Sequence, residues 1–205
     1  MYNNNIVLSS GNIHKIKEIK EILTGIPVNI LSKDDVGLKE LDVIEDGDTL
    51  EENAVKKARE ISKKVDAIVI ADDTGLFVDK LNGEPGVYSS RYSGENATYQ
   101  DNNNKLLKEL EGVPMEERTA KFRTVIAIVL EDKSIKTVVG ECSGKIAYKP
   151  KGENGFGYDP LFIVDEYNKT FAELGDEVKN QISHRANALK NLRVELENIF
   201  KGDIK

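Results

Sequence analysis

The feature that most constrains this sequence is a run of five apolar residues, Ala67–Ala71, that ends on Asp72 and Asp73. An unbroken apolar run of this length predicts a strand that is buried on both faces at the centre of a sheet. Ligands of α/β proteins bind at the carboxyl ends of such strands. Carboxylates are costly to bury there unless they are paired or bind a metal ion. Asp72 and Asp73 therefore have two interpretations, a metal or catalytic role or an ordinary turn that ends the strand.

Apolar runs alternate with segments of helical periodicity through the first hundred residues, which predicts an α/β organisation. Later in the chain, two apolar runs joined by a polar segment predict a hairpin, so the sheet is expected to be mixed. Strands are expected over Ile6–Leu8, Val28–Leu31, Ala67–Ala71, Phe122–Leu130 and Ile135–Cys142. Helices are expected from Ile13, from Leu50 after a capping box at Thr49, over Tyr99–Leu110 and at the end of the chain.

Length and charge exclude several classes of protein. The 205 residues suit one domain, and the net charge of −7 disfavours a nucleic-acid polymer as partner, although a small anion can still bind local cations. Cys142 is the single cysteine, so neither an internal disulfide nor a cysteine-based zinc site can form. The sequence shows no signal-peptide pattern and no membrane-length apolar run, so we expect a cytoplasmic protein away from membranes.

Two polar segments are candidates for phosphate and metal binding. The segment Ser10-Gly11-Asn12-Ile13-His14-Lys15 lies at a strand-to-helix turn, where backbone N–H groups favour an anion. Its alternative is a helix cap with a solvent-facing lysine. The segment Glu45-Asp46-Gly47-Asp48 offers a hard oxygen ligand for Mg²⁺, or is a solvated loop.

Two further segments suit a nucleotide base and an anion. In Gly155-Phe156-Gly157-Tyr158-Asp159-Pro160, the glycines allow close backbone approach, so an aromatic ring can stack on a base while backbone groups or Asp159 read its edge. The alternative is a structural loop whose aromatic rings fill the core. The stretch from Lys179 to Arg185 is expected to open the last helix, with Ser183 as N-cap and with Lys179, His184 and Arg185 as cationic donors. Its alternative is a capped helix with surface charges.

Together these segments suit a magnesium nucleotide, because phosphoryl chemistry needs charge neutralisation and positioning more than covalent groups. The residues alone therefore indicate a nucleotide-processing enzyme.

The order of six motifs also resembles the inosine triphosphate pyrophosphatase family, the Ham1/RdgB-like non-canonical purine nucleoside triphosphatases. The resemblance extends from about Ile6 to Leu192. The motifs are Ser10–Lys15, Thr49-Leu50-Glu51-Glu52-Asn53-Ala54, Ala71-Asp72-Asp73-Thr74-Gly75-Leu76, Pro85–Tyr92, Gly155–Pro160 and Ile182-Ser183-His184-Arg185.

The resemblance implies one domain over residues 1–205 with an α/β fold. An elongated mixed central β-sheet would be flanked by helices, in two lobes around a deep active-site cleft. It implies a homodimer that hydrolyses ITP, dITP and XTP, with Mg²⁺, to the monophosphate and pyrophosphate. Asp73 would be the proton acceptor and a metal ligand, and Glu45 the second metal ligand. The substrate-binding residues would be Ser10, Gly11, Asn12, Ile13, His14, Lys15, Thr74, Phe156, Gly157, Tyr158, Asp159, Lys179, His184 and Arg185.

Three positions depart from the family pattern without removing a group that the chemistry requires. Thr74 stands where the family usually has Ser, and Ser90 stands where Ala is common. Ala186 stands where the family usually has Gly. Two alternatives stay open: a house-cleaning pyrophosphatase for pyrimidine or other modified nucleotides, and a nucleotide-binding module without turnover.

Overall fold

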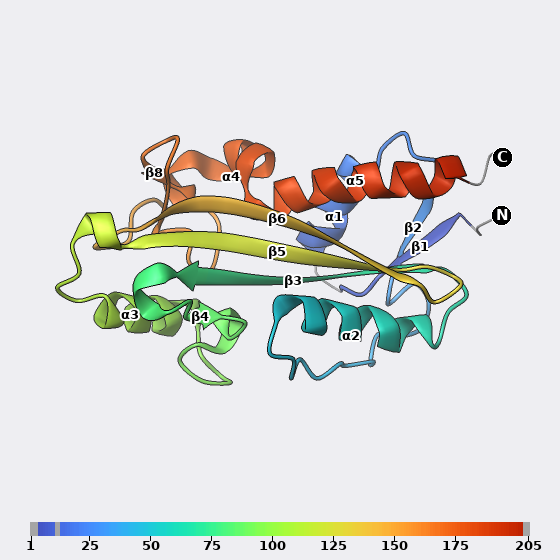
Figure 1. Ribbon diagram of the computed structural model, residues 1–205, viewed down its shortest axis with the longest axis horizontal. Helices are drawn as coiled ribbons and strands as arrows, with labels where there is room; N and C mark the ends of the chain where they lie inside the picture. The colour runs from blue at the N-terminus through green and yellow to red at the C-terminus, as the bar shows by residue number, and fades with distance from the viewer. Residues whose placement is uncertain (1–3, 11–12, 203–205) are drawn as a thin grey trace. The chain divides into compact units, whose positions relative to one another are not determined.

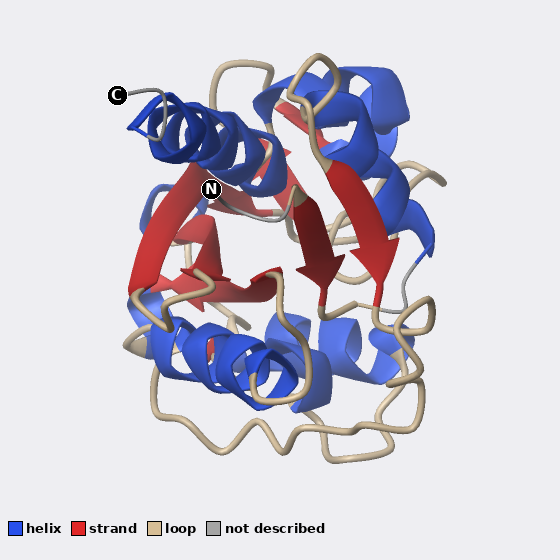
Figure 2. Ribbon diagram, turned by 90° about the vertical axis from the view of Figure 1, so that its right-hand side faces the viewer, coloured by secondary structure: helices blue, strands red, loops and turns tan. Residues whose placement is uncertain are grey.

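The computed structural model of the chain describes residues 4–10 and 13–202. Its strands form one hydrogen-bonded sheet in the order β2-β1-β3-β5-β6-β7-β8, with β4 paired to β3 (Figures 1 and 2). The strands are β1 (Asn5–Leu8), β2 (Asn29–Ser32), β3 (Ile68–Val78), β4 (Pro85–Gly86), β5 (Thr119–Val129), β6 (Ile135–Ile146), β7 (Phe162–Val164) and β8 (Lys169–Thr170). The α-helices are α1 (Ile13–Ile22), α2 (Leu50–Ser62), α3 (Tyr99–Glu109), α4 (Phe171–Ile182) and α5 (His184–Gly202).

The sheet is mixed, which confirms the predicted α/β class. Strand β1 pairs in parallel with both β2 and β3. The pairs β3–β4, β6–β7 and β7–β8 are antiparallel. Strand β1 ends at Leu8, opposite Ile70, while β3 continues to Val78.

The chain divides into two compact units. The first contains Met1–Asp73, Val125–Val139 and Ala188–Lys205, and the second contains Thr74–Thr124 and Gly140–Asn187. Each unit has its own apolar core. The single domain over residues 1–205, with a cleft between two lobes, stays a prediction.

Helices cover both faces of the strands in the first unit, with α1 and α5 on one face and α2 on the other (Figure 1). The side chains of α1 and α5 share a core with alternate residues of β1 and β3, among them Leu8 and Ile70. The buried stripe predicted for the last helix is confirmed at Leu189, Leu192, Leu196 and Ile199.

Aromatic rings fill the core of the second unit. Phe162 packs against Phe122 at 4.7 Å and against Phe171 at 5.3 Å between ring centroids. Beside them, the buried guanidinium of Arg118 donates to the carbonyl oxygens of Ile146, Leu110 and Ala147. These bonds satisfy a charged group that would otherwise be costly to bury.

Strand β3 is longer than the sequence predicted. It continues through Asp72, Asp73, Thr74 and Gly75 to Val78, so the interpretation of these residues as a turn is wrong. Pairing with β4 explains the difference, because a Cβ added at Gly75 would lie 2.5 Å from the Gly86 carbonyl oxygen. Only a glycine allows the two strands to approach this closely.

Helix ends follow the local signals. The predicted capping box is present, since the Thr49 side chain accepts from the Glu52 N–H. Helix α4 was not predicted and is interrupted at Gly175, whose φ is 76°. Among the described residues, no helix is long and apolar enough to span a bilayer.

Shortening a buried side chain in the core of the first unit is expected to destabilise the protein. Leu192→Ala, at a fully buried position, is expected to lower the free energy of unfolding by about 2–5 kcal/mol. The control, Val194→Ala two residues away at 58% exposure, is expected to change it by less than about 0.5 kcal/mol. Urea titrations followed by circular dichroism measure both, and equal effects would contradict the assignment of the core.

Candidate active site

In the first unit, α2 and β3 gather a cluster of polar side chains around Asp73. The Lys57 ammonium lies 3.3 Å from Asp73 Oδ1 and 3.1 Å from Glu45 Oε1. One helical turn earlier, Asn53 Nδ2 donates to Asp73 Oδ2 at 3.3 Å. Asn53 Oδ1 accepts from the Gly47 N–H at 2.8 Å, which ties the loop that carries Glu45 to α2. The predicted residues Glu45 and Asp73 are thus brought together.

Burial changes the protonation chemistry of this cluster. It raises the pKa of Asp73 to about 6, even though Lys57 acts in the opposite direction. Burial also lowers the pKa of Lys57, but the charges of Asp73, Asp72 and Glu45 outweigh it, so the pKa is raised overall. Lys57 is therefore a permanent cation, and Asp73 is a carboxylate that can exchange a proton near neutral pH.

The donor set at this cluster fits a magnesium ion. Two carboxylates, from Glu45 and Asp73, already face one cation, the Lys57 ammonium. Within residues 4–10 and 13–202, no three His, Cys, Asp or Glu side chains form a larger metal-binding group. Mg²⁺ is usually held by one or two carboxylates together with water and substrate phosphates, so a partial protein set of this kind is suitable.

The predicted phosphate-binding turn begins beside this cluster. The parallel pairing aligns Leu8 with Ile70, and the Ser9 N–H donates to the Ile70 carbonyl at 2.9 Å. Ser10 therefore lies just beyond the end of β1, beside the part of β3 that carries Asp72. Gly11 and Asn12 lie outside the described residues, and nothing is described of the side chains of Ile13, His14 and Lys15. The phosphate role of this turn stays a prediction.

In the second unit, Asp159 organises the loop that presents Phe156. Its Oδ2 accepts from the Phe156 N–H at 2.8 Å and from Lys179 Nζ at 2.5 Å. Gly155 has a φ of 77°, and a Cβ there would lie 2.1 Å from Asp159 Oδ2. The Asp159 side chain is therefore buried and shapes the loop, and its contact with a nucleotide base stays a prediction.

The Phe156 ring is 48% exposed and lies beside cationic side chains. Lys179 Nζ is 4.5 Å from its centroid and Arg185 Cζ is 6.0 Å away. A half-exposed ring flanked by cations suits a planar, electron-rich ligand. The structure thus brings together Phe156, Asp159, Lys179 and Arg185.

The last helix begins later than the sequence predicted. Lys179 belongs to α4, and α5 begins only at His184. Ser183 is confirmed as the cap, because its Oγ accepts from the Ala186 N–H at 3.2 Å. The His184 ring is buried and stacks on Phe122 at 4.5 Å, so it packs with the core.

Two other predicted residues make contacts within the second unit. The Tyr158 ring is buried, and its hydroxyl donates to the Ser89 carbonyl at 2.9 Å. Thr74 Oγ1 lies 2.8 Å from Thr124 Oγ1. Both side chains are therefore engaged with the protein, and their contact with substrate stays a prediction.

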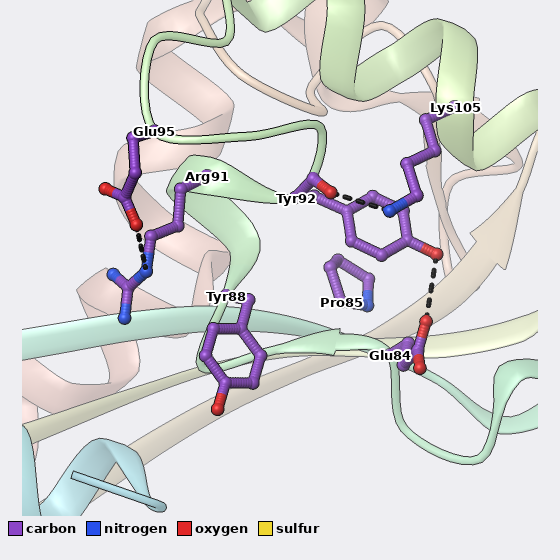
Figure 3. A pocket seen from close by; sticks show the side chains of 7 residues that line it. All are labelled: Glu84, Pro85, Tyr88, Arg91, Tyr92, Glu95 and Lys105. Carbon is purple, nitrogen blue, oxygen red and sulfur yellow. Dashed lines mark hydrogen bonds and ion pairs between the residues drawn. The ribbon is translucent and has the colours of Figure 1, made fainter. Parts of the chain in front are cut away.

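The motif Pro85–Tyr92 lines a pocket of about 310 Å³ that contains no predicted site residue (Figure 3). Lys105 of α3 reaches into it and donates to the Tyr92 carbonyl at 2.7 Å. Burial and the nearby Glu84 carboxylate raise the pKa of Tyr92 to about 12. The pocket is lined by Glu84, Pro85, Tyr88, Arg91, Tyr92, Glu95 and Lys105.

Sequence reasoning missed Asn53 and Lys57. Asn53 is fully buried next to Ala54 in the apolar stripe of α2. An amide in such a stripe needs a partner, which is a signal that could have been used. Lys57 carries no comparable signal, because lysines are common on helix surfaces.

The chain is similar over most of its length to proteins of a known family. The sequence profile of the Ham1 family matches residues 6–195. The chain belongs to the Ham1 family. The Ham1 protein of Staphylococcus aureus has a structure that matches with a TM-score of 0.88 at 43% identity, covering 95% of this chain and 98% of that one.

Relatives of this Ham1-family chain have named activities. A dITP/XTP pyrophosphatase of Thermoanaerobacter sp. (strain X514) is 58% identical over 188 residues, which cover 92% of this chain and 94% of that protein. A dITP/XTP pyrophosphatase of Bacillus subtilis (strain 168) is 48% identical over 191 residues, covering 93% and 96%.

The Lys57 cluster predicts a measurable titration. Lys57→Met removes the cation that favours the ionised form of Asp73, so the pKa of Asp73 is expected to rise above about 6. The control is Lys56→Met, which removes a neighbouring lysine that pairs instead with Asp46. Carboxyl-carbon NMR titration in metal-free buffer measures both, and an unchanged or lower pKa in Lys57→Met would refute the geometry.

Two glycines of the loop that presents Phe156 are expected to differ in their tolerance to alanine. Gly155 and Gly157 both have a positive φ, but only at Gly155 would the new Cβ overlap Asp159. Gly157→Ala is expected to cost about 1–2 kcal/mol of unfolding free energy for the backbone alone, and Gly155→Ala more. Thermal or urea unfolding of the pair measures this, and equal losses would exclude the steric role of Gly155.

Proposed function

We propose that this chain hydrolyses non-standard purine nucleoside triphosphates, namely dITP, XTP and ITP, to the monophosphate and pyrophosphate. The observation that carries the proposal is the buried carboxylate of Asp73, bonded to Lys57 and Asn53 and joined through Lys57 to Glu45. The named activity of the Thermoanaerobacter and Bacillus relatives supports the same assignment.

Asp73 is proposed as the group that accepts a proton from the attacking water. Its raised pKa matches this task better than that of an exposed aspartate, because a base with a pKa nearer the working pH holds the transferred proton more favourably. Asn53 and Lys57 hold one carboxylate oxygen each, so the orientation of the base is fixed before substrate binds. The product of attack at the α-phosphorus is a nucleoside monophosphate.

Glu45 and Asp73 are proposed to hold Mg²⁺. The ion supplies charge neutralisation at the phosphate oxygens when it is bound. The turn from Ser10 to Lys15 is proposed to position the triphosphate through its backbone N–H groups and its lysine. Lys57 adds a fixed positive charge beside the same carboxylates.

The purine base is proposed to stack on Phe156, with Gly157, Lys179 and Arg185 supplying hydrogen-bond donors. Donors that bind the 6-oxo group of hypoxanthine or xanthine would be left facing the 6-amino group of ATP, which is unfavourable. His184, which precedes Arg185, stacks on Phe122 in the core. We also propose that the protein acts as a cytoplasmic homodimer with a small nucleotide, and not a nucleic-acid polymer, as its ligand.

A substrate panel tests this proposal. Wild-type protein with Mg²⁺ is incubated separately with XTP, dITP, ITP, ATP, GTP and pyrimidine triphosphates, and pyrophosphate is resolved from orthophosphate. Rapid release of pyrophosphate from XTP, dITP and ITP supports the assignment. Release of orthophosphate alone, equal rates on ATP, or a preference for pyrimidines would overturn it.

The role of Asp73 is tested by Asp73→Asn. The amide cannot accept the proton, so kcat is expected to fall roughly a hundredfold to ten-thousandfold. Asp66→Asn, at an exposed position between α2 and β3, is the control and is expected to keep normal turnover. Circular dichroism verifies that both variants fold, and near-normal turnover in Asp73→Asn excludes the proposed base.

A further inference from the structure

A second exposed aromatic ring lies beside Phe156. Tyr99 is the first residue of α3, and its ring centroid is 6.2 Å from that of Phe156, with 38° between the ring planes. Tyr99 is 59% exposed and Phe156 is 48% exposed. Two aromatic rings of the second unit are therefore neighbours, and each is about half-exposed.

The start of α3 is fixed, so the position of Tyr99 is determined by the fold. The Thr98 side chain accepts from the Asp101 N–H, and the Asp101 carboxylate accepts from the Thr98 N–H at 2.9 Å. This capping box places Tyr99 in the first turn. Two further side chains attach α3 to the segment that precedes it. Lys105 donates to the Tyr92 carbonyl (Figure 3), and Asn102 donates to the Ser90 carbonyl at 3.1 Å.

Asn103 connects α3 to the loop that presents Phe156. It lies four residues after Tyr99, on the same face of the helix, and its Nδ2 donates to the Gly157 carbonyl at 3.0 Å. Asn103 is only 6% exposed. Helix α3 thus contacts the loop at two successive residues, through the Tyr99 ring at Phe156 and through the Asn103 hydrogen bond at Gly157.

We propose that Tyr99 provides a second aromatic surface of the purine site, and that Asn103 positions the loop so that the Tyr99 and Phe156 rings act together. This inference rests on the proposed function, which places the base on Phe156. A purine is bicyclic, so it can cover more of a two-ring surface than a pyrimidine can. Tyr99 is therefore a specificity-determining residue that favours purines over pyrimidines.

Kinetics of two substitutions separate this role from a structural one. Tyr99→Ala removes the ring and is expected to raise KM for XTP and dITP about 3- to 10-fold while kcat changes little. Tyr99→Phe keeps the ring and is expected to restore the wild-type KM. A wild-type KM in Tyr99→Ala, or a loss confined to kcat, would overturn the inference.

A fluorescence experiment tests the contact without catalysis. The chain contains no tryptophan, so Tyr99→Trp introduces a single tryptophan whose emission reports on this position. Titration with inosine monophosphate is expected to change its emission saturably, and cytidine monophosphate is expected to bind more weakly. The matched control is Tyr148→Trp, because Tyr148 is equally exposed at 59% and its ring faces Arg118. No saturable change at position 99, or the same change at position 148, would contradict the proposal.

The two proposals fail in different ways. If wild-type protein releases no pyrophosphate from XTP or dITP, the proposed function is wrong. If wild-type protein releases it and the Tyr99 variants behave as wild type, only the role of Tyr99 is wrong.

Discussion

The interaction on which the candidate chemistry depends is the contact of the Lys57 ammonium with the Asp73 and Glu45 carboxylates. Asp73 is only 9% exposed, and an unpaired carboxylate at such a position would be strongly disfavoured. Lys57 and Asn53, one turn apart on α2, satisfy one oxygen each. This arrangement keeps the Asp73 carboxylate buried and oriented, and it connects α2 directly to β3.

In the second unit, a similar charge pair fixes the loop that presents Phe156. Asp159 is almost fully buried, and its charge is compensated by Lys179 and by the Phe156 N–H. The charge pair fixes the loop, and the loop leaves Phe156 half-exposed. Each unit thus contains a buried carboxylate paired with a lysine, and in the second unit this pair also fixes the loop that presents Phe156.

Local signals in the sequence were sufficient for much of the fold. The apolar run Ala67–Ala71 and the capping residue Thr49 were identified because each acts through its immediate neighbours. The extension of β3 through Gly75 was not predictable, because it depends on pairing with Gly86.

The same distinction applies to the site. The motifs that carry Asp73, Glu45 and Phe156 were found by order and residue type. Lys57 was missed because its partner lies 16 residues away, and nothing near Lys57 distinguishes it from a surface lysine. Tyr99 was missed because only the folded chain brings it beside Phe156.

In the proposed reaction, this chain directs water to the α-phosphorus of a purine nucleoside triphosphate. Hydrolysis of XTP in water enriched in heavy oxygen, followed by mass spectrometry of both products, tests it most directly. We predict one heavy oxygen in xanthosine monophosphate and none in pyrophosphate. Heavy oxygen in pyrophosphate, with an unlabelled monophosphate, would show attack at the β-phosphorus and exclude the proposed attack at the α-phosphorus.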